Sequence, residues 1–139
     1  MSKVIYEETT YREVPESMVV SQIDDAWHPV KDRNYIEWWY FDAMNPDGSL
    51  VRGQIFIAGN MARPKTVTTG IRASYVATDG TEMVMEQRFP YSAFRASTDV
   101  CDVQVGPNFI KGDLSEYRIH IESGGGYLDL EMESEIDGI

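Results

Sequence analysis

Two parts of the chain differ in how apolar and polar residues alternate. Residues 116–136 alternate strictly, which places apolar side chains such as Ile119 and Leu130 on one face and charged side chains on the other. Such alternation is typical of antiparallel strands with one face in water. Residues 35–58 instead carry bulky apolar side chains on both faces. The pattern predicts that these earlier strands have packed core on one side and, on the other, either a ligand cavity or a second layer of protein.

Turn signals divide the rest of the chain into short strands. The sequence Asn45-Pro46-Asp47-Gly48 is typical of a tight turn, since proline presets one backbone angle and glycine accepts a positive one. Hairpins are predicted over residues 35–58, 66–89 and 116–136. Single strands are predicted over residues 4–6, 18–23, 100–105 and 109–112, and a short helical turn fits residues 91–98. No stretch has the pattern and caps of a long amphipathic helix. The chain is thus predicted to be all-β, an antiparallel barrel, sandwich or strongly bent sheet.

The predicted strand over residues 35–44 holds four consecutive aromatic rings behind an acid. At a period of two, Trp38 and Tyr40 fall on one face, whereas Glu37, Trp39 and Phe41 fall on the other. Register then requires that one aromatic pair packs in the core while the other pair lines an apolar cavity. Either pair can be the one at the cavity, so all four aromatic residues are candidate ligand-binding residues.

Glu37 and His28 are the candidate catalytic residues. Burial between apolar neighbours would raise the pKa of the Glu37 carboxyl, so that it could keep a proton near neutral pH and donate it to an alkene. The neighbouring aromatic rings could stabilise the resulting carbocation. Alternatively, Glu37 is structural, paired with an arginine such as Arg52 or Arg72 or hydrogen-bonded to loop backbone. His28 precedes Pro29 in a loop, where it could shuttle protons or brace the loop against the aromatic strand.

Composition and charge narrow the class of protein. The chain has 139 residues, of which 42% are hydrophobic and 12% aromatic, and this indicates one folded domain. Twelve basic against 23 acidic residues give a formal net charge of −11, which argues against a nucleic-acid partner or an anionic membrane surface. No apolar run approaches the roughly 20 residues of a membrane helix, so no membrane span is expected. The single Cys101 and the polar first residues favour a cytoplasmic location.

Several other kinds of chemistry lack their sequence signals. Two histidines without paired cysteines make no zinc site, and residues 124–126, three glycines, join two strands rather than a strand and a helix. We therefore expect no metal and no cofactor. Cys101 lies on the apolar side of a predicted strand and is expected to be an inert thiol. Met83 and Met85 suit either an adaptable apolar lining or plain core filling.

Two motifs resemble one protein family. The first is Asp24-Asp25-Ala26-Trp27-His28-Pro29, followed after a polar spacer by Glu37-Trp38-Trp39-Tyr40-Phe41 and a glycine-containing turn. The second comprises Cys101-Asp102-Val103, Gly106, Gly112-Asp113, Tyr117-Arg118-Ile119-His120 and Leu128-Asp129-Leu130. Together they are similar to the first domain of the carotenoid hydratase (hydroxyneurosporene synthase)/AttH-like family, from about residue 24 to the end.

The resemblance implies a fold, a domain organisation and a function. Residues 1–139 would form a single lipocalin-like β domain, with a leading segment and first strands over residues 1–23. This domain would be the N-terminal half of a longer protein, whose C-terminal lipocalin-like domain would be its partner. The implied function is handling of an isoprenoid- or polyene-like hydrophobic small molecule, as part of a hydratase, which is a hydro-lyase, or of a Diels–Alderase-like cyclase. The alternative is a non-catalytic binding module for an apolar ligand.

The last residues also predict an interaction. Asp137-Gly138 is a turn signal, but only Ile139 follows it. A turn should lead into another strand, so we expect a cut chain with one unpaired sheet edge. Such an edge is expected to be capped or to bring two copies together as a homodimer.

Overall fold

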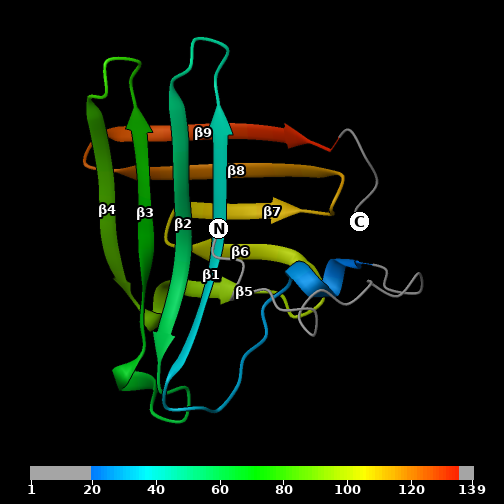
Figure 1. Ribbon diagram of the computed structural model, residues 1–139. Coiled ribbons are helices and arrows are strands. Elements are labelled where there is room, and N and C mark those ends of the chain that lie inside the picture. The colour runs from blue at the N-terminus through cyan, green and yellow to red at the C-terminus, as the bar shows by residue number, and fades with distance from the viewer. Residues whose placement is uncertain (1–19, 135–139) are drawn as a thin grey trace, which may run out of the picture.

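A computed structural model describes residues 20–134 and shows two antiparallel sheets (Figure 1). The first sheet has the strand order β1-β2-β3-β4, formed by Tyr35–Met44, Leu50–Gly59, Thr68–Val76 and Glu82–Pro90. The second sheet has the order β5-β6-β7-β8-β9, formed by Phe94–Ala96, Cys101–Val105, Asn108–Gly112, Glu116–Ser123 and Gly126–Glu133. Short 3-10 turns are η1 (Gln22–Asp25), η2 (Pro64–Thr66) and η3 (Tyr91–Ala93). Neighbouring strands in each sheet follow one another in the sequence, so local hairpins build both sheets.

The turn between β1 and β2 illustrates how the sequence sets these hairpins. Met44 pairs with Leu50, and the Asn45 backbone N donates to the Ser49 carbonyl over 2.8 Å. The Asp47 carboxylate accepts from the Ser49 backbone N over 2.8 Å, and Gly48 takes the positive φ of +88°. Local turn chemistry therefore fixes the register of β1 against β2.

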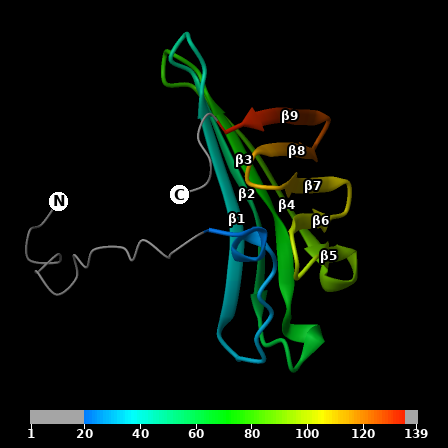
Figure 2. The ribbon, with the colours of Figure 1, turned by 90° about the vertical axis from the view of Figure 1, so that its right-hand side faces the viewer.

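The core lies between the two sheets. Strands of the second sheet run across those of the first (Figure 1), and the two sheets lie face to face (Figure 2). Side chains from both inner faces are fully buried there, namely Ile55, Ile57 and Ile71 from the first sheet and Val103, Val105 and Ile121 from the second. Burial of this apolar surface is the main stabilising contribution to the sandwich.

The predicted all-β antiparallel fold is confirmed. Within the described residues, however, neither sheet closes on itself, since β1 and β4 are the edges of the first and β5 and β9 those of the second. The two sheets separate where β4 ends at Pro90, which has no N–H to donate, and the chain turns through η3. A closed barrel of the lipocalin-like kind stays a prediction.

The three predicted hairpins match β1–β2, β3–β4 and β8–β9, and the predicted helical turn is η3. The strand predicted over residues 18–23 is wrong in its described part, because η1 begins at Gln22. There, the Ser21 backbone N donates to the Asp24 carboxylate over 2.7 Å, and this short-range bond favours a turn over a strand. The strand predicted over residues 4–6 and the edge predicted at residues 138–139 lie outside the described residues.

Strand β1 sends one aromatic pair into the core, as predicted, and leaves the other pair exposed. Trp39 is only 7% exposed and packs in the core with Phe41, whereas Trp38 is 54% exposed on the opposite face together with Tyr40. The Trp39 indole Nε1 donates to the Asp25 carbonyl over 3.1 Å, so its polar atom is satisfied inside the core. The core pair is therefore Trp39 and Phe41.

Two further sequence predictions can be compared with this arrangement. Cys101 is buried, and burial raises the pKa of its thiol to about 12, as expected of an inert cysteine. Over residues 20–134, the structure contains no helix that is both long enough and apolar enough to cross a bilayer.

Candidate functional site

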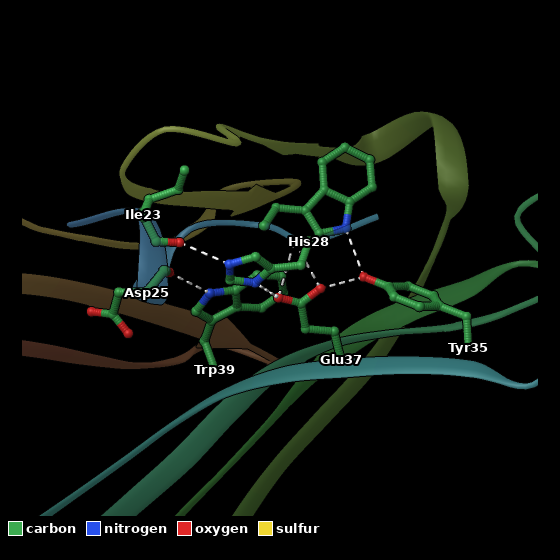
Figure 3. Close-up of polar contacts among 7 residues, drawn as sticks. Ile23, Asp25, His28, Tyr35, Glu37 and Trp39 are labelled. Atoms are coloured by element: carbon green, nitrogen blue, oxygen red, sulfur yellow. Dashed lines mark hydrogen bonds and ion pairs between the residues drawn. The ribbon is translucent and has the colours of Figure 1, made fainter. Parts of the chain in front are cut away.

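The structure brings the two candidate catalytic residues together. The segment between η1 and β1 folds back over the start of β1, so that His28 lies against Glu37 (Figure 3). Nδ1 of His28 is 3.1 Å from Oε1 of Glu37, and the His28 backbone N also donates to both carboxylate oxygens, over 3.2 and 3.1 Å. The Tyr35 hydroxyl donates to Oε2 of the same carboxylate. Three donor groups therefore converge on Glu37.

The surroundings of His28 favour its protonated form. Its second ring nitrogen, Nε2, lies 2.8 Å from the Ile23 carbonyl oxygen, which can only accept a hydrogen bond. Because Nδ1 faces a carboxylate and Nε2 faces a carbonyl, an imidazolium with both N–H groups satisfies both contacts. The hydrogen bond to Glu37 is the main cause that raises the pKa of His28 above its usual 6.5. The contacts of His28 therefore fit an imidazolium that donates from both ring nitrogens.

Aromatic side chains hold this pair in place. The Trp27 indole Nε1 donates to the Tyr35 hydroxyl over 2.8 Å, while burial, with the bond to Glu37, raises the pKa of Tyr35. Tyr35 therefore stays a hydrogen-bond donor toward Glu37 at all physiological pH values. A second anchor lies at Asp25, whose side chain accepts from the Tyr117 hydroxyl. These contacts fasten η1 and the following loop to both sheets.

The alternative pairing of Glu37 with an arginine is wrong. Arg52 and Arg72 point to the other face of the first sheet, where they lie 3.4 Å from Glu82 and 3.9 Å from Glu86. The predicted bonding of Glu37 to loop backbone is confirmed by the His28 N–H. With a side chain only 18% exposed, Glu37 is a partly buried carboxylate that orients a loop histidine.

An apolar cleft opens at the opposite end of the same sheet face. It has a volume of about 320 Å³ and is lined mostly by apolar side chains from β2, β3, β4 and β9, including Val51, Tyr75, Met83, Met85, Tyr127 and Leu128. Strand β9 crosses the first sheet short of its two hairpin tips (Figure 1), so the inner face beyond β9 is not covered by the second sheet. Met83, 68% exposed, lies at this uncovered end.

The sequence pointed to only part of this cleft. Met83 and Met85 were expected either to line an apolar site or to fill the core, and both line the cleft. Tyr75 and Tyr127 were not identified from the sequence as cleft residues. A weak signal existed for Tyr127, because it is a large aromatic residue directly after the 124–126 turn at a position where charged residues otherwise alternate. Their contribution depends on where β9 crosses β3 and β4, which no local pattern reports.

The candidate aromatic residues stand at different distances from the cleft. Phe41 is opposite Gly53, and its ring takes the space where a side chain on Gly53 would lie, beside the cleft residue Ala73. Phe41 therefore packs against Ala73, a residue that lines the cleft, without lining the cleft itself. Trp39 lies two residues farther along β1 from the cleft, while Trp38 and Tyr40 face away from the cleft.

The acid–base pair and the cleft are well separated. Residues that pair across β1, β2, β3 and β4 form rows running across the first sheet. The row that contains Glu37 ends at Phe89 on β4, and the row that contains the cleft residue Met83 begins at Ala43 on β1. Six residues of strand separate these rows, which corresponds to roughly 20 Å. A small molecule in the cleft would therefore not touch the Glu37 carboxylate.

A second histidine makes a separate polar cluster on the outside of the second sheet. His120 lies 2.5 Å from Asp129 and 2.7 Å from Glu122, and these bonds raise its pKa above 6.5. Both ring nitrogens of His120 therefore contact carboxylates. Over the described residues, no group of three or more His, Cys, Asp and Glu side chains is placed to hold a metal ion.

No protein-family model matches the chain, and neither a curated protein nor a solved structure is similar to it. The family resemblance carried by the two sequence motifs therefore remains a prediction.

Proposed function

We propose that this domain binds a hydrophobic small molecule in the cleft between the hairpin ends of the first sheet and β9. The observation that supports the proposal is the cleft itself. Its volume of about 320 Å³ is at the lower end of the range of roughly 300–1,000 Å³ for small-molecule sites. Exposed apolar side chains such as Met83 and Tyr127 surround it, and burial of their surface would drive binding.

The lining indicates what kind of ligand fits. Among the described residues that line the cleft, none is charged, so a neutral ligand avoids the cost of burying an unpaired charge. Methionines adapt to irregular shapes, and tyrosines offer flat ring faces. Tyr75, which shares the inner face with Val51 and Met83, supplies a hydroxyl group for a single polar end of the ligand. An isoprenoid- or polyene-like molecule with one hydroxyl or keto group has this chemistry.

Binding without chemistry is the function that the geometry favours. The lining holds no carboxylate or histidine, and Glu37 lies at the other end of the sheet face. A ligand in the cleft thus has no proton donor at hand. A lipocalin-like binding module for an apolar ligand accounts for these features.

A charge placed in the cleft tests this proposal. Met83→Asp is expected to weaken the binding of a neutral apolar fluorescent dye at least about tenfold, since the dye would have to desolvate a carboxylate. Met44→Asp is the matched control, because Met44 is 75% exposed on the opposite face of the first sheet. It should bind the dye as the unaltered chain does. Equal dye affinity in both variants would contradict a site in this cleft.

A second candidate function is proton donation to a polyene by the His28–Glu37 pair, as part of a hydratase or cyclase. The favouring observation is a partly buried carboxylate bonded to an imidazole. In hydration, the acid would protonate one alkene carbon, water would add to the resulting carbocation, and the oxonium would return its proton to the carboxylate. The product gains one water, and the acid is regenerated.

Glu37→Gln tests this second function because it keeps the shape of the side chain and removes the acid. In the two-domain protein that the resemblance implies, the variant is expected to lose turnover of an acyclic polyene, measured as the gain of one water by mass. Its affinity for the apolar dye should be unchanged. Full turnover in the variant would show that Glu37 is structural.

A further inference from the structure

The outer face of the first sheet carries an exposed apolar surface. Figure 2 shows the second sheet on one side of the first only. On the other side, β1 presents large apolar side chains that are each more than half exposed, namely Ile36, Trp38, Tyr40 and Met44. Phe56 of β2 lies opposite Trp38 and extends this surface, which we call the outer face. Contiguous apolar surface of this kind marks an interaction site in soluble proteins.

The outer face is flat around Phe56, and beside this flat part lies a hollow of about 270 Å³ whose lining includes Tyr40 and Arg52. Phe56 pairs with Gly70 of β3, and a side-chain carbon on Gly70 would lie only 3.1 Å from the Phe56 ring. The ring therefore lies across the glycine instead of standing upright. Ala58 and Ser74 on the same face have small side chains that do not project far from the sheet. A flat sheet face can pack against another flat sheet face at a separation of about 10 Å.

The charges on the outer face indicate which kind of partner it can bind. Its acids and arginines balance, with Asp42, Glu82 and Glu86 against Arg52, Arg72 and Arg88. Two of the arginines already contact acids, since Arg52 lies 3.4 Å from Glu82 and Arg72 lies 3.9 Å from Glu86. The chain as a whole carries −11, so two copies repel each other unless they meet through a neutral surface. The outer face of the first sheet is such a surface.

The area of the outer face gives an estimate of how tightly two copies could bind through it. Four strands of nine or ten residues span about 30 by 19 Å, or roughly 600 Å² per copy. Two copies would bury roughly 1,200 Å², the lower limit of a specific interface. The side chains are those that interfaces favour, with Trp38 and Tyr40 among arginines. A reversible, weak dimer follows from these values.

We propose that two copies of this chain pack outer face to outer face about a twofold axis, with Trp38 near its centre. Identical surfaces then meet, as a twofold interface requires. This second layer of protein explains why β1 is bulky on both sides. The proposal concerns the side of the sheet away from the cleft and does not depend on the function proposed for that cleft.

Sedimentation of the full chain over a range of concentrations tests the proposal. We expect a reversible dimer with a dissociation constant on the order of 10 μM. Trp38→Ser should weaken it at least about tenfold, since a central tryptophan carries much of the energy of such a contact. The matched control is Tyr127→Ser, which removes an exposed aromatic residue at the cleft and should leave the dimer unchanged. Raising salt from about 50 mM to about 500 mM should strengthen the dimer, because it screens the repulsion between the two acidic copies.

Three results would overturn the proposal. The first is a chain that stays monomeric at all concentrations, which would leave the face to a small ligand, a different protein or another segment of the chain. The second is a dimer that Trp38→Ser leaves intact, and the third is one that Tyr127→Ser weakens as much. Tyr40→Ser serves as the second variant if Trp38→Ser does not fold, as judged by its circular dichroism.

Discussion

Replacing Trp39 by Ala is expected to lower the free energy of unfolding by about 3–5 kcal/mol, whereas the same change at the adjacent Trp38 should lower it by less than about 1 kcal/mol. The two residues differ in environment and not in chemistry. Trp39 packs against Phe94, with ring centres 6.2 Å apart, and its indole N–H is bonded to Asp25. Its removal leaves a large cavity and an unpaired carbonyl. Trp38 loses only contacts at an exposed surface.

Urea unfolding followed by circular dichroism measures this difference. The protein should be dilute enough to be monomeric, so that loss of a dimer contact at Trp38 does not add to the change in stability. Equal destabilisation by both replacements would contradict the assignment of the inner and outer faces of β1.

The second large effect is expected at Glu37. Replacement by Leu removes the acceptor shared by the His28 backbone N–H and the Tyr35 hydroxyl. The Tyr35 hydroxyl, on a buried side chain, would lose its acceptor. A buried donor left without an acceptor costs about 1–3 kcal/mol, so the variant should lose stability in that range. Glu86→Leu is the matched control, since its carboxylate is more than half exposed and lies 3.9 Å from Arg72. That change is expected to have little effect.

The effect of Glu37→Leu should depend on pH through His28. Folding raises the pKa of His28, so its pairing stabilises the fold fully below the unfolded value of about 6.5 and is lost as the pH rises through the raised pKa. The stability difference between the unaltered chain and the variant should therefore shrink above that pKa. Because His28 is half exposed, this part of the difference is small.

NMR titration of the assigned histidines gives the direct readout. In the unaltered chain both histidines should titrate above 6.5, and in Glu37→Leu only His28 should return toward it. His120 is the internal control, since its partners Asp129 and Glu122 are untouched. An unchanged His28 pKa in the variant would contradict the ion pair.

Much of the fold could be predicted because the hairpins are local. Positive-φ glycines at Gly48, Gly80 and Gly124 mark the turns of the three predicted hairpins, and the alternation between them sets the strand faces. The three-residue strand β5 was too short to give a pattern. How the second sheet crosses the first depends on contacts between distant residues, which local turn and strand signals do not encode.

The candidate site could be predicted only where its partners are close in sequence. His28 and Glu37 are nine residues apart, and the loop before Pro29 made their contact plausible. The arginine alternative was wrong because Arg52 and Arg72 lie at positions whose register sends them to the outer face. Anchors such as the contact of Tyr117 with Asp25 join residues 92 positions apart, so no sequence motif could reveal them.

The proposed function is the binding of a neutral apolar molecule in the cleft beside Met83. It is tested most directly by NMR of the chain labelled with ¹³C at its methionine methyl groups, titrated with a neutral polyene alcohol. Met83 and Met85 line the cleft, whereas Met44 lies on the opposite face of the first sheet. We expect saturable shifts of the Met83 and Met85 methyl signals and none at Met44. Shifts at Met44 with Met83 and Met85 unmoved, or no shift at any methionine up to the solubility limit of the ligand, would contradict it.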